Sequence, residues 1–530
     1  MAQSDPLATH RHAPGRLRGL ALNAWRALEH RFDAAFGSAC NLLRHLGALG
    51  FLMFWLLAIS GIYLYAAIDT SATGAWRSID NLSREQWWLG GVLRSLHRYA
   101  ADAFFIVMLA HLLREWLFGH ERGFRRFSWL TGVPLLIFAS VSAIGGFWLN
   151  WDQLGQFSAI ATAEWLDWLP IFGSPFTRNF IRGAAVSDRL FSLFVFVHLG
   201  VPLLLVFGLW FHIQRISRAA VFPPRPLALG TVAALLALAL ARPVMSQAAA
   251  DLAIVPTTLE YDWLLLAIHP LTYAISAGGV WMLLAGTLAL LLALPFLPGR
   301  HTREPVAVVS PAHCNGCRRC FDDCPYAAVT MIPHPIRRMG RELAQVDPVL
   351  CASCGICTGA CPSSTPFRSL ATLTTGIDMP QAPIDALRGR LRRTLAAMDT
   401  PHPIVVFGCD HGARVSSLAT DDVATFSLLC IGALPPAFVE YALRDGADGV
   451  VVATCRDGGC EFRLGARWTD ERLRGAREPH LRDSVPRERV AQVDAGAGEE
   501  ARLRAAVASL RARLPYVNMP VGPAPKIHHG

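Results

Sequence analysis

Long runs of apolar residues, separated by shorter polar segments, fill the chain as far as Pro298. Each run is close to the roughly 20 residues that a helix needs to cross a bilayer. The runs predict an all-α bundle of six transmembrane spans, Leu46–Ile68, Leu89–Phe118, Trp129–Leu149, Leu190–Gln214, Leu227–Met245 and Trp263–Leu297. Because the sixth span passes through Pro270, we expect it to be kinked or broken.

The segment before the first span has a different pattern. Residues 10–45 hold six arginines, with Trp25, Leu28, Phe32 and Phe36 at helical intervals. This predicts a basic amphipathic helix on the cytoplasmic membrane surface, with a mobile basic tail as the alternative. The first 20 residues show no apolar core with a small-residue cleavage site, so no signal peptide is predicted.

Beyond Pro298 the pattern is that of a globular protein. PIVVFGC, FSLLC and GVVVATC indicate buried parallel strands, alternating with helices such as Pro435–Arg444. A further strand, Arg489–Asp494, and a helix, Glu499–Leu514, are predicted after Glu478. The predicted domains are a basic segment (1–45), the membrane domain (46–298), a cysteine-rich module (306–375), a linker (376–402), a small α/β domain with a parallel sheet (403–515) and a tail (516–530).

The charge distribution bears on location and partners. The net charge is +9, but almost all of the basic residues are arginines spread over loops, so nucleic-acid binding is disfavoured. About fifteen arginines lie in the N-terminal segment and in Arg114–Arg126, Arg215–Arg225 and Arg300–Arg303, against about six in the opposite loops. The positive-inside rule therefore places both ends in the cytoplasm, in the inner membrane of a bacterium.

Two of the predicted spans carry paired histidines. His97 and His111 lie fourteen residues apart in one span, and His198 and His212 repeat that spacing in another. Fourteen steps return to nearly the same face of a helix, about 21 Å further along. A single histidine in such a span is more often structural, but two matched pairs predict axial ligands for two b haems. We expect His97 to pair with His198 near the periplasmic face and His111 with His212 near the cytoplasmic face.

Glycines and arginines support the haem prediction. Gly47 and Gly61 are fourteen residues apart, as are Gly132 and Gly146, and missing side chains at these heights would admit flat macrocycles. Helix packing through small residues is the alternative explanation for each glycine. Two arginines, Arg94 and Arg114, lie three residues outside the histidines and are candidates for haem propionates or for ordinary interfacial positions. They complete the set of residues predicted to bind the cofactor.

With these features, residues of about 40–297 resemble the cytochrome b of quinol-oxidising bc-type complexes. The likeness continues through GGFWLNW (Gly145–Trp151), where that family has Gly-Tyr-Val-Leu-Pro-Trp, so Asn150 departs from the pattern. The family's Pro-Glu-Trp-Tyr signature falls on Tyr261–Leu264, which makes Asp262 the counterpart of the glutamate at the outer quinol site. The resemblance thus implies Asp262 as a quinol proton acceptor, against an ordinary interfacial aspartate.

Two further positions of the membrane domain bear on its cofactors and on proton transfer. The family has a variant with a third haem on a cysteine just before the first glycine, but His45 stands there and Cys40 lies elsewhere, so no third haem is expected. Asp102, which we expect to be buried in the second span, is a candidate for a proton path or for a hydrogen bond at a haem edge.

The cysteine-rich module contains one motif twice. Four cysteines at the spacing C-x2-C-x2-C-x3-C-P occur at Cys314, Cys317, Cys320 and Cys324 and again at Cys351, Cys354, Cys357 and Cys361. This is the run of bacterial two-cluster ferredoxins, in which the fourth cysteine serves the other cluster. It therefore predicts a ferredoxin-like α+β module with two 4Fe–4S clusters, one on Cys314, Cys317, Cys320 and Cys361 and one on Cys351, Cys354, Cys357 and Cys324. Zinc is the competing metal for these cysteines.

Four more cysteines lie in the predicted α/β domain. Cys409, Cys430 and Cys455 close predicted strands, and Cys460 follows after a short turn. Carboxyl ends of parallel strands share one edge of the sheet, so the four thiols can hold a 2Fe–2S cluster, a zinc ion, or nothing. Residues of about 400–475 resemble the delta subunit of methyl-viologen-reducing hydrogenase, through FGC and LLCIGALPPAFVEYALRDGADGVVVATCRDGGCEF. That resemblance implies a 2Fe–2S cluster and electron exchange with heterodisulfide-reductase-type flavoproteins.

The order of these parts predicts a respiratory electron-transfer chain in one polypeptide. We expect a membrane-bound, quinone-reactive oxidoreductase subunit that links a cytoplasmic flavoprotein, hydrogenase or dehydrogenase to quinone in the lipid bilayer. No flavin or nickel signature is found, so the primary substrate oxidation is expected on another chain. The alternative is a relay and docking subunit with no quinone chemistry of its own.

Overall fold

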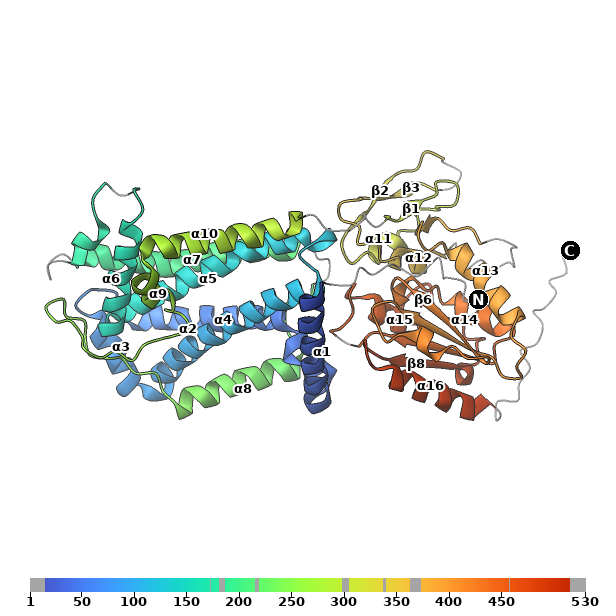
Figure 1. The fold of residues 1–530 in the computed structure, drawn as a ribbon, viewed down its shortest axis with the longest axis horizontal. Helices are drawn as coiled ribbons and strands as arrows, with labels where there is room; N and C mark the ends of the chain where they lie inside the picture. Colours follow the sequence, from blue (N-terminus) through green and yellow to red (C-terminus); the bar gives the residue numbers. More distant parts are fainter. Residues whose placement is uncertain are drawn as a thin grey trace. The chain divides into compact units, whose positions relative to one another are not determined.

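The computed structural model describes residues 15–171, 173–180, 186–214, 219–297, 305–336, 340–362, 373–456 and 458–514. The chain forms two compact units (Figure 1), one made of most of residues 14–299 and one made of most of residues 300–530. The tail predicted for residues 516–530 lies outside the described residues.

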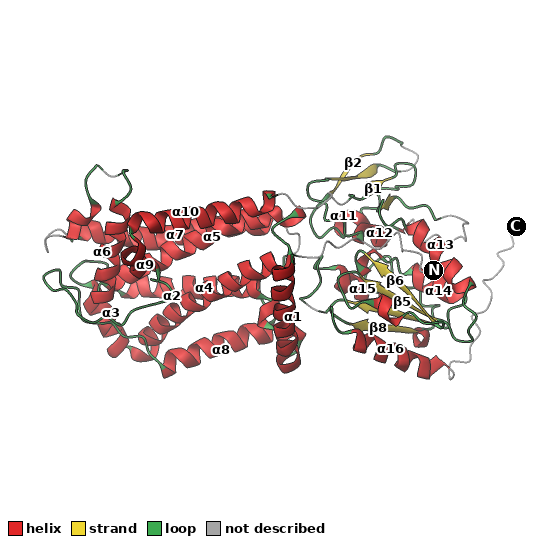
Figure 2. Ribbon diagram, viewed as in Figure 1, coloured by secondary structure: helices red, strands yellow, loops and turns green. Residues whose placement is uncertain are grey.

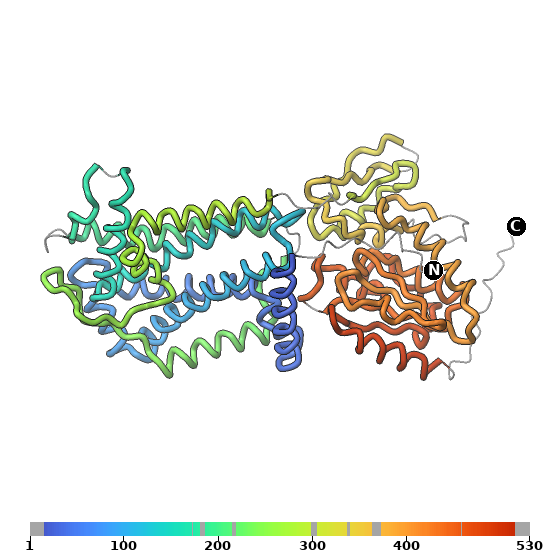
Figure 3. The backbone as a smooth tube through the Cα atoms, in the orientation of Figure 1, coloured from blue at the N-terminus to red at the C-terminus, as the bar shows by residue number. Residues whose placement is uncertain are grey.

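The first unit consists of helices (Figure 2). Within it α2 runs along α4 and α5 runs along α7, so two helix pairs lie side by side (Figure 3). The helices are α1 Arg16–Phe36, α2 Leu46–Ala67, α3 Ala75–Arg84, α4 Val92–Phe118, α5 Arg126–Asn150, α6 Gln153–Asp167, α7 Asp188–Gln214, α8 Arg225–Ala241, α9 Ile268–Ile275 and α10 Ala277–Ala293.

Four segments of this unit are long and apolar enough to cross a membrane, Leu46–Ala67, Gly123–Asn150, Asp188–Gln214 and Ala277–Phe296. The prediction of a helical membrane domain is therefore confirmed, while the number of six spans is not. The remaining two predicted spans form helices that fall short of those criteria. Helix α4 has 27 residues but carries Arg94, Arg98 and Asp102, and α8 has only 17 residues.

The last predicted span is broken, but not at its proline. Pro270 lies in the first turn of α9, where a missing backbone N–H costs nothing. The break is at Ser276, whose φ of 82° ends α9 and whose hydroxyl then accepts a hydrogen bond from the Gly279 N–H at the start of α10. A side-chain cap at a left-handed residue thus separates the two helices.

A buried apolar cluster lies midway along the paired helices. It includes Phe54 of α2, Phe104 of α4, Ala139 of α5 and Leu205 of α7. Each of these residues is seven positions from both members of the histidine or glycine pair on its own helix. The cluster therefore separates two levels in the bundle. We call them the His97 level, with His198, and the His111 level, with His212.

The second unit is built on a parallel four-stranded sheet of order β6-β5-β7-β8. Its strands are β5 Ile404–Cys409, β6 Val423–Leu428, β7 Gly449–Thr454 and β8 Val490–Asp494. All four lie where the sequence predicts strands, so the α/β parallel-sheet domain is confirmed. The strands β5 and β7 are buried along their whole length, as expected for a sheet covered on both faces.

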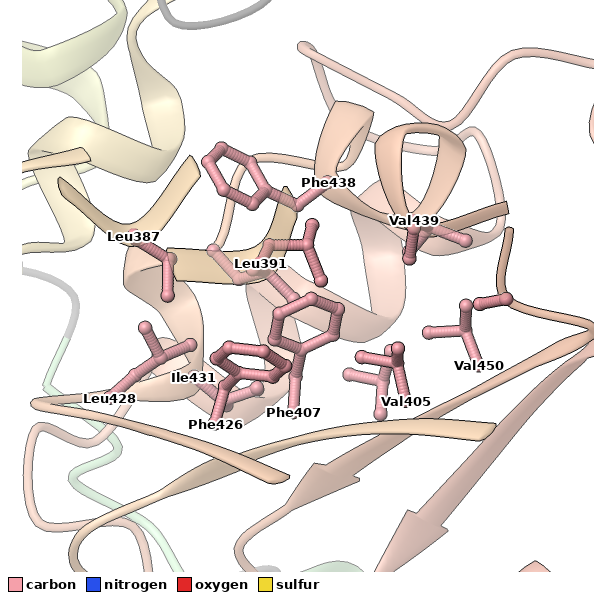
Figure 4. Packing of buried hydrophobic residues seen from close by; sticks show 14 of the residues in the cluster. Leu387, Leu391, Val405, Phe407, Phe426, Leu428, Ile431, Phe438, Val439 and Val450 are labelled. Atoms are coloured by element: carbon pink, nitrogen blue, oxygen red, sulfur yellow. The ribbon is translucent and has the colours of Figure 1, made fainter. Parts of the chain in front are cut away.

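Helices cover the two faces of that sheet. On one face, Leu387 and Leu391 of α13 (Ile384–Ala396) and Phe438 of α14 (Ala437–Arg444) pack on Phe407 and Phe426 (Figure 4). On the other face, the cluster around Ile404 and Val451 includes three leucine and valine side chains of α16 (Glu500–Arg513). The helix α15 (Gly465–Leu473) follows the last cysteine.

The cysteine-rich module precedes the sheet domain. It contains an antiparallel pair, β2 Val329–Pro333 with β3 Glu342–Val346, and the short helices α11 Arg319–Asp322 and α12 Ile356–Ala360. The predicted linker is structured: within it β4 (Ile377–Asp378) pairs with β1 (Val308–Val309), and α13 covers the sheet. In α13 the leucines lie on the buried face and the arginines on the other, which is the pattern of an amphipathic helix packed on a core.

Candidate redox centres

Two imidazole rings face each other at the His97 level. The ring centroids of His97, from α4, and His198, from α7, are 6.2 Å apart. Two metal–nitrogen bonds of about 2 Å, with about 1 Å from each nitrogen to its ring centre, span about 6 Å. The pair therefore has the separation that one metal ion between two axial imidazoles requires, and these residues fit a b haem.

The second histidine pair lies at the His111 level, on the same two helices. His111 and His212 are close enough to interact electrostatically. Both stand fourteen residues beyond the first pair, on the far side of the apolar cluster around Phe104. The fold therefore brings all four predicted ligands together as two levels.

Each of the four paired glycines contacts one histidine. A Cβ atom at Gly61 would lie 3.1 Å from Cε1 of His97, and one at Gly146 would lie 2.9 Å from Cε1 of His198. At the other level the corresponding distances are 3.3 Å from Gly47 to His111 and 3.0 Å from Gly132 to His212. The glycines thus make room for the imidazoles, and room for a flat macrocycle at the same heights stays a prediction.

The same close approach lets the Nδ1 atoms reach the neighbouring backbone. Nδ1 of His198 donates to the Ser142 carbonyl at 2.8 Å, four residues before Gly146. His97 and His212 bond to the backbone at Leu57 and Ser128, which again lie four residues before a paired glycine. With Nδ1 donating to an acceptor, Nε2 is the nitrogen that remains for a metal.

Two hydroxyls assist these contacts. Ser60 Oγ lies 3.0 Å from Nδ1 of His97, and Thr131 Oγ1 lies 3.2 Å from Nδ1 of His212. Each hydroxyl residue stands directly before a paired glycine. Neither was predicted from the sequence, although a hydroxyl beside Gly61 and beside Gly132 was a visible signal.

His111 has a charged neighbour instead. Oε1 of Glu115 lies 3.9 Å from its Nδ1, and the same carboxylate is 2.5 Å from Nδ1 of His120 and 3.5 Å from Arg125. Arg114 is 3.6 Å from Glu115. This charge network was not predicted either. His120 and Arg125 come from the turn after α4, and nothing in their spacing relates them to His111.

The two flanking arginines have protein partners. Arg94 is buried and donates to Ser83 at 2.5 Å, Ser246 at 2.9 Å and Asn150 at 3.2 Å. Arg114 forms an ion pair of 3.0 Å with the buried Glu29 of α1. The predicted basic segment is thus a helix that docks through an acidic side chain, and pairing of both arginines with propionates stays a prediction.

The predicted proton acceptor is also held in place. Asp262 forms an ion pair with Arg98, and its Oδ1 accepts the backbone N–H groups of Leu264 at 3.0 Å and Leu265 at 2.7 Å. Arg98 pairs at 2.5 Å with Asp102 as well. Asp102 is therefore not the buried residue that we expected, because 27% of its side chain is exposed.

The cysteine-rich module gathers its thiols into the two predicted sets. Cys314, Cys317, Cys320 and Cys361 line one pocket, which we call the first set. Burial raises the pKa of Cys320 to about 12. Ionisation of such a thiol is unfavourable unless a metal ion supplies positive charge, so the donors fit an iron–sulfur cluster.

The second set consists of Cys324, Cys351, Cys354 and Cys357. These four thiols are within electrostatic range of one another. Burial raises the pKa of Cys354 and of Cys357. The fourth cysteine of each motif thus lies with the other motif, as in the exchange that a two-cluster ferredoxin requires.

The last four thiols meet at the carboxyl edge of the sheet. Cys409 and Cys460 are each within hydrogen-bonding distance of both Cys430 and Cys455, which closes a ring that we call the four-thiol group. Hydrogen bonds from those two neighbours lower the pKa of Cys409 and of Cys460. Over the described residues, no three His, Cys, Asp or Glu side chains are arranged around a single metal ion.

Comparison with known proteins finds three family matches along the chain. Residues 32–220 match the family described as cytochrome b/b6/petB. Residues 313–365 match the 4Fe-4S dicluster domain, and residues 404–517 match the delta subunit of methyl-viologen-reducing hydrogenase. The three resemblances inferred from the residues are thereby confirmed.

One similar solved structure is that of a hyperthermophilic respiratory complex III. It is 18% identical, covers 53% of this chain and 82% of its own, and has a TM-score of 0.41. The family matches and the four apolar helices indicate an integral membrane protein that carries haem and iron–sulfur chemistry. The chain is thus a membrane electron-transfer protein.

Proposed function

We propose that the chain links a cytoplasmic redox partner to the quinone pool of a bacterial inner membrane. The partner is a heterodisulfide-reductase-type flavoprotein, a hydrogenase or another dehydrogenase, which performs the primary oxidation. The observation that carries the proposal is the facing pair of imidazoles at 6.2 Å, repeated one level further along the same helices. Polar side chains inside apolar membrane helices are costly and usually functional, which supports a cofactor role for these pairs.

The residues would hold five redox groups. His97 with His198 and His111 with His212 would each bind a b haem, and these groups supply one-electron chemistry within the bilayer. The first and second cysteine sets would each bind a 4Fe–4S cluster, and the four-thiol group a 2Fe–2S cluster. Around the histidines, the glycines fix the depth of each ring and the Nδ1 acceptors fix its orientation.

The proposal includes six spans with both termini in the cytoplasm. Helix α4 is counted because its 27 residues reach both histidine levels, and its charged side chains near His97 are paired: Arg98 with Asp102 and Asp262. Helix α8 is counted because it packs along α4. Pairing lowers the cost of charges at membrane depth.

Quinone would react near Asp262, at the His97 level, and at a second position near the His111 level. The ion pair of Asp262 with Arg98 must then open, or exchange for the substrate, before the carboxylate takes a proton. The same ion pair favours the second candidate function, a relay and docking subunit without quinone chemistry. In that case Asp262 only fixes the start of the segment after Tyr261.

One experiment separates the two functions. The purified full chain in detergent micelles is reduced at its iron–sulfur clusters with a low-potential donor, and haem absorbance is followed after a soluble quinone analogue is added. If the subunit reacts with quinone, the analogue oxidises its haems within a few turnovers. The Asp262→Asn variant should slow this oxidation at least tenfold. Asp251→Asn, at an exposed loop position, is the control and should match the unmodified chain.

Each outcome decides between them. Haems that accept electrons from the clusters but ignore the quinone analogue would establish the relay function. Redox titration of the visible spectrum must also show two b haems, and a chain without haem contradicts both functions.

A further inference from the structure

The cysteine-rich module and the sheet domain are in contact at glycine residues, where their backbones lie close together. The short helix α12 packs on Ile431–Ala433, the 3-10 turn directly after Cys430. A Cβ atom at Gly359 would collide with the backbone carbonyl of Gly432, and one at Gly355 would lie 3.0 Å from Cβ of Ala433. Glycine is required at Gly359 because the two backbones approach within contact distance, and at Gly355 because its φ is +74°.

A buried arginine bridges the same two parts. Arg472 of α15 is 1% exposed, and its guanidinium donates to the Gly432 carbonyl at 2.9 Å and to Asp323 at 2.5 Å. Asp323 also accepts from Arg477 at 2.5 Å. Arg477 is also paired with Glu471 at 2.7 Å, so it has a carboxylate of its own and the charge that lies nearest the thiols is the buried guanidinium of Arg472.

That charge lies close to two groups of thiols. Asp323 directly precedes Cys324 of the second set, and Arg472 is within electrostatic range of Cys430 in the four-thiol group. Nε of Arg472 is buried and has no hydrogen-bond partner in the described part of the chain. A buried cation with an unused donor is costly unless a negative group lies near it.

The first set lies in a pocket lined by the cysteine-rich module and the residues just after it, and by no described residue of the four-stranded sheet. Its pocket is lined by Asn315, Gly316 and Arg318 of the ferredoxin-type motif, and its Cys317 is exposed. In contrast, the contact with the sheet domain involves neighbours of Cys324 on both sides, since Pro325 lies 3.5 Å from Arg463. Cys357 itself belongs to α12.

We propose that Arg472 is a positioning residue that fixes the second cysteine set against the four-thiol group, so that these two sites exchange electrons directly. The inference rests on the proposed function, because it requires that both sites hold clusters. One electron lost at the four-thiol group is gained at the second set, with no proton or bond change. The first set receives that electron next, and its exposed cysteine makes it the outlet of this unit.

The first test measures magnetic coupling in the reduced full chain. Electron spins relax faster when a second paramagnetic cluster is near, so the relaxation of the 2Fe–2S signal reports which cluster is its neighbour. Cys354→Ala removes the second set and should raise the saturability of that signal severalfold. Cys317→Ala removes the first set and should leave it nearly unchanged.

The second test uses Arg472 itself. Arg472→Met keeps much of the volume but removes the charge, so the reduced, more negative states of both neighbouring clusters lose stabilisation. The midpoint potentials of the 2Fe–2S cluster and of the second 4Fe–4S cluster should both fall, while those of the first cluster and the haems stay constant. Arg467→Met, on the exposed face of the same helix, is the matched control.

The outcomes are distinct. A Cys317 variant that affects the 2Fe–2S signal more than the Cys354 variant overturns the order. If Arg472→Met shifts the midpoint potential of the first cluster, or of no cluster, the role of Arg472 is overturned. If charge is the cause of the shift, adding Asp323→Asn should reverse part of it. If Cys354→Ala fails to accumulate, the potentials decide alone. If the unmodified chain shows no iron–sulfur signals, the proposed function itself fails.

Discussion

The His97 and His111 levels each have two histidines on the same two helices, and a glycine beside each histidine, yet their surroundings differ. At the His97 level, the Nδ1 atoms meet a serine hydroxyl and backbone carbonyls, which are neutral. At the His111 level, one Nδ1 lies near the carboxylate of Glu115, which is tied to His120 and Arg125. The difference shows that ligand geometry and electrostatic tuning are set by separate parts of the sequence.

The geometry follows from a repeat, and the tuning does not. A spacing of fourteen on four helices places two equivalent sites, because fourteen steps nearly close whole turns. The carboxylate and its partners come from the end of α4 and the turn after it, which exist at only one end of the bundle. The two haems should therefore bind alike and differ in reduction potential.

The largest expected effect is loss of one haem at a time. His198→Ala should remove the haem of the His97 level only, and His212→Ala that of the His111 level only, because each imidazole belongs to one pair. Haem content per chain, from the visible spectrum of the purified variants, should fall from two to one in each case. His30→Ala, in α1 and outside both levels, should keep two. Loss of both haems in either variant would contradict independent levels.

A smaller effect is expected at the glycines, and it should be graded. A Cβ at Gly146 would lie 2.9 Å from His198, and one at Gly47 would lie 3.3 Å from His111. Alanine at Gly146 forces the ring to move, at a cost of about 1–3 kcal/mol, while alanine at Gly47 needs a shift of tenths of an ångström. We expect Gly146→Ala to lower haem occupancy more than Gly47→Ala, measured by titration with haemin. The reverse order would contradict the distances between these glycines and the histidine rings.

The contrast between levels also explains what the sequence could predict. The histidines, glycines and cysteine motifs lie in patterns with a fixed period, and helices and strands convert a period directly into a shared face. The sheet strands were predictable for the same reason. Ser60 and Thr131 were missed because only the packing of α2 on α4, and of α5 on α7, brings them to a ring.

Other errors have a similar cause. The break at Ser276 depends on a backbone angle that Pro270 does not control. The docking of α1 depends on Glu29 meeting Arg114, 85 residues away in the sequence. The pairing of Glu29 with Arg114 forms only when distant segments pack, so local pattern and composition do not indicate it.

A moderate effect on potential is expected at Glu115. Its negative charge stabilises the oxidised, more positive form of a haem at the His111 level. Glu115→Gln should raise the midpoint potential of that haem by several tens of millivolts, since a charge at this range contributes on the order of 1 kcal/mol. Glu164→Gln, on a helix away from that level, serves as the control in a spectroscopic redox titration. An equal shift of both haems would contradict the local origin of the difference.

The smallest expected effect distinguishes the two hydroxyls. Ser60 already donates to the Leu56 carbonyl at 2.6 Å, so its oxygen accepts from Nδ1 of His97 and makes that ligand more basic. Ser60→Ala should therefore raise the potential of the His97-level haem, and Thr131→Ala that of the His111-level haem. Both shifts should be smaller than the shift from Glu115→Gln, because the backbone acceptors at Leu57 and Ser128 remain. If Ser60→Ala moved the His111-level haem instead, the assignment of rings to levels would be wrong.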